Sequence, residues 1–439
     1  MGYHVNFEFL DEEAIENAIT CLNYRMDKVI FFGEKELIKT KKAALRLFLT
    51  ETCEVGKKAQ LSAREAVRFI EISETDLNDV LGKMRDAIEA EAKEASHRFI
   101  DVTGGEGLAL LAFGILAKEL NLPMHLYDVE TGALNEYLSD DSNSISKNGK
   151  KKKIPWNVET FVKMQGGDVL DTGWGTKVIY SEEDLADIDK MWKLMNQYKT
   201  YWNGFCGVLA RFHSSQNVIN SAKDALVFEG RVEDVKKVLR EESGYYSQFR
   251  ERNNSGMKNR KESKDEREAR EERELKRAYD KLNEMIKACK EKELLSEFAY
   301  TAYGYRYEFK NEFIASCLKK AGNILEQHVY KKVKEQCPDV IDHQVGVQID
   351  WDIIDTCKFT EVSNEIDVLG LKGYVPVFIS CKAERIDRVD QDVLYELDVV
   401  ARRLGGKYAK KVLAVTEMWR GRHRNRADEM GIEVWEEVE

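Results

Sequence analysis

The stretch that most constrains the fold of this chain is residues 363–382, which read SNEIDVLGLKGYVPVFISCK. In its first half, acidic and apolar residues alternate in a way that is typical of a β-strand with two different faces. Lys372 and Gly373 then supply turn chemistry, and residues 375–382 form a second β-rich run. The sequence therefore predicts a β-hairpin.

An acid inside one strand and a lysine at the end of the other need a reason, because a buried sheet prefers apolar side chains. Asp367 is suited to hold a hard divalent cation. Lys382, beside that cation, is suited to orient or deprotonate an attacking water and to steady charge on a phosphate. These residues indicate metal-assisted phosphodiester hydrolysis. A hairpin whose polar residues face water and whose lysine ends an edge is the alternative.

Two amphipathic helices are expected on either side of the hairpin. The upstream helix covers residues 313–329 and carries Glu326. The downstream helix covers residues 390–404 and carries Gln391 and Tyr395 one turn apart.

This order of helix with Glu, strand with Asp, strand ending in Lys, and helix with Gln and Tyr resembles the PD-(D/E)xK nuclease superfamily, the restriction-endonuclease-like fold. The resemblance covers about the last third of the chain. It implies that Glu326 is the helix-borne acid, Asp367 the central metal ligand and Lys382 the catalytic lysine. It also implies that Gln391 and Tyr395 support the metal site and contact the substrate backbone.

One position departs from the pattern of this superfamily. The family usually has an acid two residues before the lysine, where this chain has Ser380. Under the resemblance, a manganese or magnesium ion is therefore held by Glu326, Asp367 and the main-chain carbonyl of Cys381.

The N-terminal part of the chain alternates short apolar strands with helices. The expected strands are residues 4–10, 28–33, 69–73, 98–102 and 124–129. Such alternation implies a parallel sheet with right-handed crossovers, which is a Rossmann-like domain. The whole chain is thus expected to be a multidomain α/β protein.

A D-x-T-G-G pattern ends the fourth of these strands, at Thr103, Gly104 and Gly105. Ligands of such sheets bind at the carboxyl ends of the strands, and two glycines let a ligand approach the main chain. The spacing is neither G-x-G-x-x-G nor a Walker motif, which disfavours a dehydrogenase-like enzyme or ordinary ATP binding. A tight strand-to-helix connection without a ligand is the alternative.

Together with the nuclease-like C-terminal part, this pattern resembles the CRISPR-associated Rossmann fold (CARF), the sensor domain of type III CRISPR ancillary effectors. The resemblance implies a homodimer that binds cyclic oligoadenylate, with cyclic tetra-adenylate as the expected ring, across its two-fold axis. Binding would activate cleavage of DNA, RNA or both, with single-stranded DNA and RNA as the expected substrates, in antiviral defence. The implied pocket residues are Phe9, Leu10, Asp11, Gly33, Thr103, Gly104, Gly105 and Glu106. The last of these stands where the family usually has a threonine or another small polar residue.

These features divide the 439-residue chain into four parts. The expected parts are the CARF sensor at 1–145, a linker and winged-helix-like connector at 146–257, a charged connecting helix at 258–293 and the nuclease domain at 294–439. The winged-helix-like connector is taken from similar effectors.

Charge and cysteine content exclude some other classes of protein. A net charge of −11 argues against a protein that coats nucleic acid nonspecifically, although basic residues crowd the segment 402–426 and suit a phosphate backbone. Eight cysteines without a C-x-x-C pair argue against a zinc site and a disulfide framework. Without a leader sequence or a long apolar run, a cytoplasmic protein with no membrane partner is expected.

Ser380 also leaves open a different class of function. A ring-nucleotide-binding transcription regulator would keep a catalytically inactive nuclease-like domain only to grip DNA. Replacing Asp367 or Lys382 with Ala distinguishes the two hypotheses, because only an enzyme would lose function.

Overall fold

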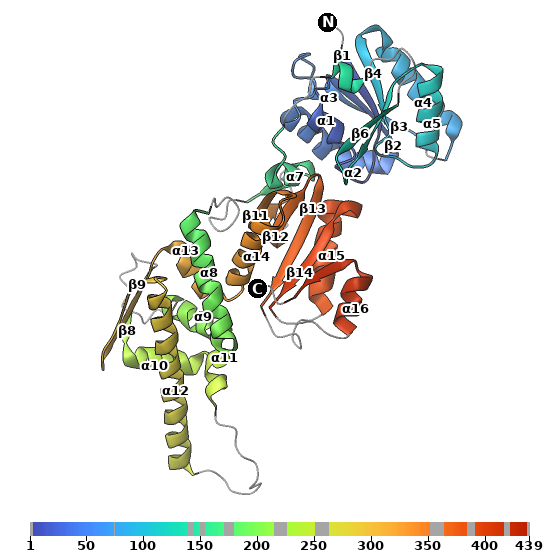
Figure 1. The fold of residues 1–439 in the computed structure, drawn as a ribbon. Helices are drawn as coiled ribbons and strands as arrows, with labels where there is room; N and C mark the ends of the chain where they lie inside the picture. Colours follow the sequence, from blue (N-terminus) through green and yellow to red (C-terminus); the bar gives the residue numbers. More distant parts are fainter. Residues whose placement is uncertain are drawn as a thin grey trace.

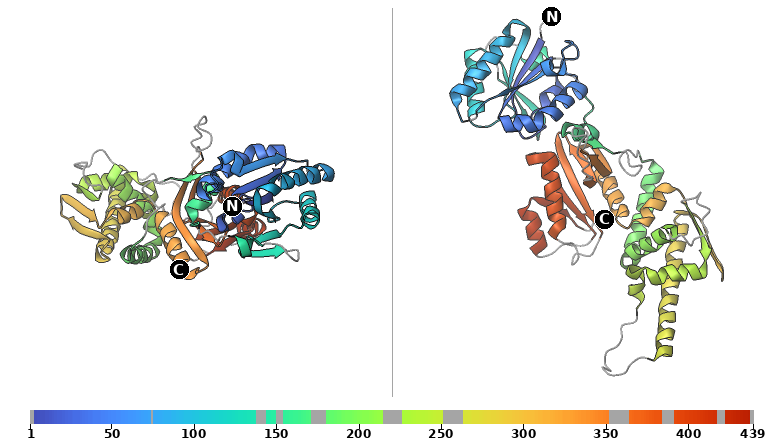
Figure 2. Two further views of the ribbon diagram at one scale, coloured as in Figure 1. Left: turned by 90° about the horizontal axis from the view of Figure 1, so that it is seen from above. Right: turned by 180° about the vertical axis from the view of Figure 1, so that it is seen from behind.

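The structure of the protein is a computed structural model. The described residues are 3–73, 75–137, 144–149, 154–170, 180–214, 226–250, 263–351, 364–383, 391–416 and 422–436. Figure 1 shows an N-terminal α/β unit and a helical unit at opposite ends of the molecule, with the C-terminal sheet between them. The views in Figure 2 show the same arrangement from above and from behind.

The N-terminal unit is built on a six-stranded sheet in the order β3-β2-β1-β4-β5-β6. All neighbouring strands run parallel except β6, which is antiparallel to β5. The strands are β1 (Tyr3–Phe9), β2 (Lys28–Gly33), β3 (Val67–Glu71), β4 (Ala95–Asp101), β5 (Met124–Asp128) and β6 (Ala133–Tyr137). The predicted parallel sheet is confirmed, and β6 is an addition to it.

Helices cover both faces of this sheet. One face packs on α4 (Leu77–Ala90) and α5 (Leu108–Glu119), and the other on α1 (Ile19–Asn23) and α2 (Lys35–Leu47). The short helix α3 (Ala63–Ala66) precedes β3. The strand order reverses between β1 and β4, so the loops that follow these two strands meet at one edge of the sheet.

The C-terminal sheet also has six strands, in the order β15-β14-β13-β12-β11-β7. The strands are β7 (Asp168–Val169), β11 (Val340–Asp350), β12 (Asn364–Lys372), β13 (Val375–Lys382), β14 (Lys410–Val415) and β15 (Ile432–Trp435). The predicted hairpin is confirmed as β12 and β13, which pair antiparallel from Lys372↔Val375 to Val368↔Ile379. Its turn is Gly373–Tyr374, and the φ of +58° at Gly373 suits a residue without a Cβ.

Helices pack on both faces of the C-terminal sheet. On one face lie α14 (Asn323–Gln336) and the helical unit, and on the other lie α15 (Gln391–Gly405) and the N-terminal unit. Further α-helices of this part are α7 (Val158–Met164), α13 (Glu312–Lys319) and α16 (Arg422–Glu429). The single helix predicted for 313–329 was wrong, because the chain turns extended at Lys320 and separates α13 from α14.

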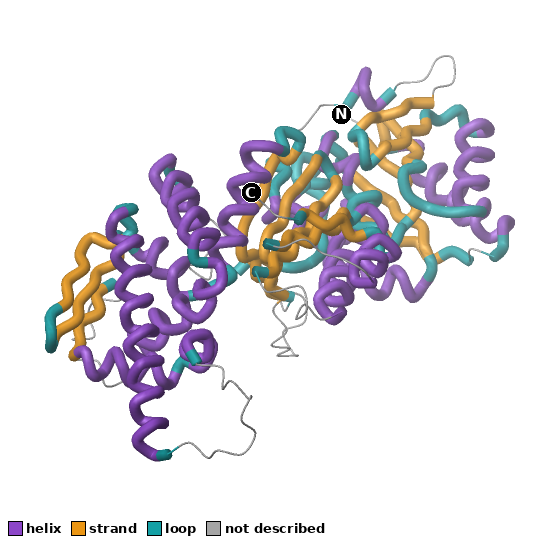
Figure 3. Tube along the Cα trace, turned by 60° about the horizontal axis from the view of Figure 1, so that its bottom comes forward, coloured by secondary structure: helices purple, strands orange, loops and turns teal. Residues whose placement is uncertain are grey.

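The helical unit combines long helices with a three-stranded sheet, β8-β10-β9. Its elements are α8 (Glu182–Gln197), α9 (Lys199–Ser214), β8 (Val227–Arg231), α10 (Val232–Glu241), α11 (Ser243–Tyr246), α12 (Lys264–Glu291), β9 (Leu295–Tyr300) and β10 (Gly304–Phe309). Figure 3 shows this sheet on the outer side of the unit, with helices between it and the C-terminal sheet. Because β8 pairs with β10, residues on both sides of position 294 share one sheet. The four-part division of the chain stays a prediction.

Within the described residues, no helix combines the length and the apolar character that crossing a lipid bilayer requires. The short helix α6 (Ile145–Asn148) lies between β6 and α7 in the sequence.

Candidate functional site

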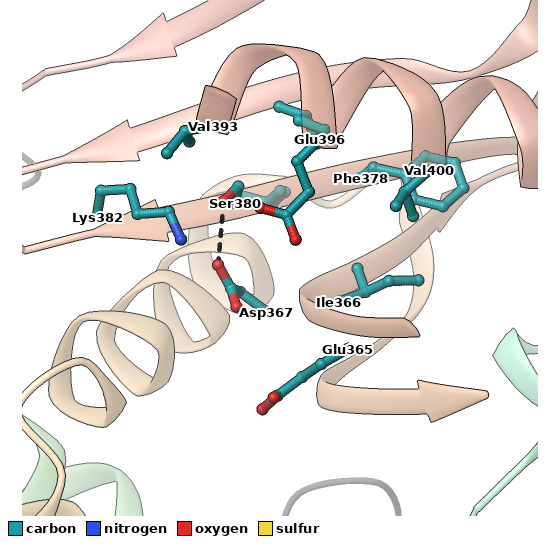
Figure 4. A pocket seen from close by; sticks show the side chains of 11 residues that line it. Glu365, Ile366, Asp367, Phe378, Ser380, Lys382, Val393, Glu396 and Val400 are labelled. Carbon is teal, nitrogen blue, oxygen red and sulfur yellow. Dashed lines mark hydrogen bonds between the residues drawn. The ribbon is translucent and has the colours of Figure 1, made fainter. Parts of the chain in front are cut away.

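A cavity of about 60 Å³ lies between the β12–β13 hairpin and α15 (Figure 4). It is lined by Glu365, Ile366, Asp367, Phe378, Ile379, Ser380, Lys382, Val393, Glu396, Leu397 and Val400. The cavity is therefore lined by two of the predicted catalytic residues, Asp367 and Lys382. It is also lined by Ser380, which stands where the superfamily usually has an acid.

Asp367 is held in the cavity by the strand beside it. Its Oδ2 accepts hydrogen bonds from the main-chain N–H of Cys381 at 2.6 Å and from the hydroxyl of Ser380 at 3.2 Å. Burial raises the pKa of Asp367, although the Cys381 N–H, the charge of Lys382 and the Ser380 hydroxyl act against this rise. The carboxylate is thus oriented by donors, and its charge is only partly compensated.

Lys382 ends β13 on the same face as Ser380, because alternate residues of a strand point the same way. Figure 4 shows its ammonium group directed toward Asp367. The structure therefore brings Asp367 and Lys382 to one cavity. Their catalytic roles stay a prediction.

Glu326 approaches this site from α14 and does not line the cavity. Burial, followed by the charge of Asp367, raises the pKa of Glu326 to about 7. Two carboxylates that disfavour each other's ionisation are a donor set that fits a hard divalent cation, which would relieve the repulsion.

A cation here would need further oxygen ligands beyond these two side chains. No group of three or more His, Cys, Asp or Glu side chains within the described ranges is arranged to hold a metal ion. The Cys381 thiol is buried and its pKa is raised well above the usual value by burial, so it stays protonated. The predicted role of the Cys381 carbonyl stays a prediction.

The two site residues predicted on the downstream helix are Gln391 and Tyr395, and Tyr395 is not among the described residues that line the cavity. The Gln391 side chain lies outside the described residues. Tyr395 is exposed, and its hydroxyl accepts a hydrogen bond from Arg426 Nη2 at 2.9 Å, with the guanidinium carbon 5.3 Å from the ring centre. The residue of α15 that does line the cavity is Glu396. Sequence reasoning missed it, although the absent acid at position 380 was a reason to search the next helix for one.

The predicted ligand residues of the N-terminal unit gather where β1 and β4 end. Asp11 Oδ2 accepts a hydrogen bond from the Gly105 N–H at 3.0 Å. The φ of Gly105 is +97°, and a Cβ there would lie 2.9 Å from Phe9, so this position requires glycine. Likewise, a Cβ on Gly104 would lie 3.0 Å from the Cβ of Asp11. The two glycines therefore let β4 and its turn approach the loop after β1.

The other predicted ligand residues lie around this contact. A Cβ on Gly33 would lie 2.9 Å from Leu10, which is fully buried. Thr103 Oγ1 accepts a hydrogen bond from the Tyr127 N–H at 2.9 Å, and Glu106 is exposed. The structure brings these residues to one edge of the sheet. Their binding of a ligand stays a prediction.

The loop after β1 also contacts the C-terminal part of the chain. Glu13 Oε1 accepts a hydrogen bond from the Lys407 N–H at 2.8 Å. Glu16 Oε1 accepts one from the Tyr408 hydroxyl at 2.5 Å and lies 3.0 Å from Lys407 Nζ. Burial raises the pKa of Glu16 to about 7, although Tyr408 and Lys407 favour its ionised form. This acidic loop, residues 10–17, therefore joins the N-terminal edge to the end of α15.

Several of the basic side chains expected to follow a phosphate backbone are paired with acids. Arg402 and Lys411 both lie within 3 Å of Asp398, at 2.9 and 2.7 Å. Arg424 pairs with Glu436 at 2.8 Å. These charges are neutralised within the chain, which reduces the positive field of this segment.

A six-stranded mixed sheet that presents an aspartate and a lysine in one cavity, with an acid on a flanking helix, defines a nuclease-like α/β domain. Residues 317–438 match the family model of the Card1-like endonuclease domain. The sequence matches no curated protein.

Two solved structures resemble the protein over nearly its whole length. Protein VC1899 from Vibrio cholerae shares 15% identity at a TM-score of 0.61, covering 99% of this chain and 94% of that one. Can2 from Sulfobacillus thermosulfidooxidans, solved in complex with cyclic tetra-adenylate, shares 14% identity at a TM-score of 0.56, with the same coverage. The fold of the whole chain is thus like that of VC1899 and Can2. The predicted nuclease domain at the C-terminal end agrees with the match of residues 317–438 to the Card1-like endonuclease domain.

Proposed function

We propose that this protein is a metal-dependent endonuclease that cyclic oligoadenylate activates in type III CRISPR defence. The observation that carries the proposal is the shared cavity of Asp367 and Lys382 within the Card1-like endonuclease domain. The same region holds Glu326 close enough for its carboxylate and that of Asp367 to affect each other's charge.

The side chains of the cavity divide the work of phosphodiester hydrolysis. When bound, manganese or magnesium polarises the phosphate and lowers the pKa of a water. Asp367 and Glu326 hold the cation, and the Cys381 N–H fixes the orientation of the Asp367 carboxylate. Lys382 orients the attacking water and stabilises negative charge that develops on the phosphate.

The proposed activator is cyclic tetra-adenylate, bound by a homodimer at the edge where β1 and β4 end. Can2, which has the same fold, was solved with this ring. A route for the signal is supported by the acidic loop, since Asp11 contacts Gly105 while Glu13 contacts Lys407. Lys407 follows α15, whose residues Val393 and Glu396 line the cavity. A ligand that favours one position of this loop would shift α15.

The experiment that tests this proposal incubates the full chain with labelled single- and double-stranded DNA and RNA. Each substrate is combined with Mn²⁺ or Mg²⁺ and with each size of cyclic oligoadenylate or none. We expect almost no cleavage until both the metal and cyclic tetra-adenylate are present. Constitutive cleavage would contradict the gate, and no cleavage under any condition would contradict the nuclease.

The position of Ser380 favours one second candidate, a ring-nucleotide-binding transcription regulator with an inactive nuclease-like domain. Ser380 lines the cavity at the place where the superfamily has an acid. Lys382→Ala separates the candidates. A regulator keeps ligand-dependent DNA binding in this variant, whereas a nuclease loses cleavage and retains ligand binding.

A further inference from the structure

The cavity beside Asp367 contains a carboxylate that the chemistry above leaves unused. Glu396 lies on α15 and lines the cavity together with Asp367, Ser380 and Lys382. Figure 4 shows its carboxylate pointing from the helix into the space near Ser380 and Asp367. We propose that Glu396 supplies the acidic metal ligand that β13 lacks at Ser380. This inference rests on the proposed nuclease function and names a further residue of that site.

The backbone geometry of two regular elements determines where Glu396 points. On α15, Val393 and Val400 also line the cavity, and they lie three residues before and four residues after Glu396, on the same strip of the helix. On β13, Phe378 and Ser380 share a face because the side-chain period of a strand is two residues. The helix therefore holds Glu396 over the strand position from which the carboxylate is missing.

Glu396 also differs from the other acids of the cavity in its partners. Glu365 pairs with Lys320 at 3.6 Å, and Asp367 accepts two hydrogen bonds from β13. Glu396 forms neither a hydrogen bond nor an ion pair with any residue that the structure describes. Its oxygens are thus available to a cation, and hard divalent cations select carboxylate oxygens.

The proposed ligands, Asp367 and Glu396, come from opposite walls of the cavity and would both have to contact a bound cation. Across the described ranges, no three acidic, histidine or cysteine side chains already form a metal-holding group. Glu396 is exposed, and its staggered rotamers let the carboxylate swing toward Asp367 without moving the helix. Hydrogen bonds from β13 fix the Asp367 carboxylate, whereas the exposed Glu396 side chain is able to change its rotamer.

Titration of the full chain with Mn²⁺ by calorimetry, without nucleic acid or activator, tests this role. Glu396→Gln keeps the size of the side chain and removes its charge, and we expect the dissociation constant for Mn²⁺ to rise about tenfold or more. Asp392→Asn is the matched control, because this exposed acid lies one turn earlier on α15 and outside the cavity. We expect it to change the dissociation constant by less than about twofold.

A rescue variant separates a ligand from a residue that only supports the fold. In Ser380→Asp combined with Glu396→Gln, the carboxylate returns to the strand, and we expect Mn²⁺ affinity to return to within about threefold of the original. Unchanged Mn²⁺ affinity in Glu396→Gln, or no saturable Mn²⁺ binding by the original chain, overturns the inference. Failure of the rescue, with a lower melting temperature of metal-free Glu396→Gln, overturns it as well.

The result that would refute the proposed nuclease function differs from the result that would refute the role of Glu396. A chain that binds Mn²⁺ through Glu396 but cleaves no nucleic acid under any activator supports the carboxylate role and refutes the nuclease. A chain that cleaves normally while Glu396→Gln binds Mn²⁺ normally supports the nuclease and refutes the carboxylate role.

Discussion

Two aspartates, one in each six-stranded sheet, differ in their electrostatic surroundings: Asp101 is buried and Asp367 is partly buried. Asp101 ends β4, and His125 Nε2 and Thr20 Oγ1 lie 2.9 and 2.5 Å from its Oδ2. Burial by itself would raise the pKa of Asp101, but the His125 charge and these hydrogen bonds outweigh burial and lower it. The pKa of Asp367 is raised, because burial outweighs its donors and its neighbours include the acid Glu365.

The difference supports a structural role for Asp101 and the proposed ligand-binding role of Asp367. Asp101 has its charge compensated inside the protein, and its Oδ1 accepts a hydrogen bond from the Thr103 N–H at 2.9 Å, which fixes the start of the glycine turn. Asp367 is only partly compensated and faces a cavity. A perturbed carboxylate in a cavity is the expected mark of a functional site.

Asp367→Asn gives the largest expected effect and tests the functional side of this comparison. We expect the single-turnover cleavage rate with Mn²⁺ and activator to fall about 10³-fold or more, because the proposed central metal ligand is lost. The free energy of unfolding should stay constant or rise by about 1 kcal/mol, since a poorly compensated, partly buried charge is removed. Strong loss of stability in this variant would make Asp367 a structural residue like Asp101.

Asp101→Asn tests the structural side. It removes the charge of the buried carboxylate that His125, Thr20 and Thr103 contact, and we expect urea denaturation to show a loss of about 3–5 kcal/mol. Asp86→Asn, at an exposed position of α4, is the control and should change stability by less than about 0.5 kcal/mol. An Asp101 variant as stable as the control would mean that the pair with His125 contributes little.

Gly105→Ala asks how tightly the turn after Asp101 is packed. The left-handed φ and the contact of a Cβ with Phe9 should together cost about 2–3 kcal/mol. Gly373→Ala is a matched change, because φ is also positive there but no atom lies within 4 Å of the added Cβ. The control should therefore cost only about 1 kcal/mol by the same denaturation measurement.

Glu16→Gln gives the smallest expected effect and depends on pH. The folded pKa of Glu16, about 7, lies above its ordinary value of 4.5, so its contribution to stability is full below pH 4.5 and is lost as pH rises through 7. The original chain should therefore lose about 1–2 kcal/mol relative to Glu16→Gln between pH 5 and pH 8. Parallel stability curves of the two proteins over this range would show that Lys407 already compensates the carboxylate.

Patterns that depend on a local period were predictable from the sequence. The β12–β13 hairpin and the parallel strands follow from apolar residues that recur along a few positions. Between β1 and β2 the only α-helix among the described residues is the short α1, and the segment before it is held in turns, because the Asn17 side chain bonds both the N–H and the carbonyl of Asp11, each at 2.8 Å. Such side-chain bonds compete with the helix and hold the chain in turns.

The cavity itself was only partly predictable. Asp367 and Lys382 are acid and base in strands that otherwise favour apolar residues, so each was visible as an exception. Glu396 is an ordinary exposed acid on an amphipathic helix. Whether it faces the hairpin depends on how α15 packs against β13. That packing is a tertiary property, and the helical period alone does not specify it.

The C-terminal sheet has apolar neighbours on both faces, with the helical unit packed on one and the N-terminal unit on the other. Its last strand in the order, β7, also comes from residues far upstream of the matched segment 317–438. A fragment cut at the limits of that segment would expose two apolar surfaces and the unpaired edge of a strand to water. Such exposure favours aggregation over folding. The segment 317–438 therefore depends on the rest of the chain for its stability.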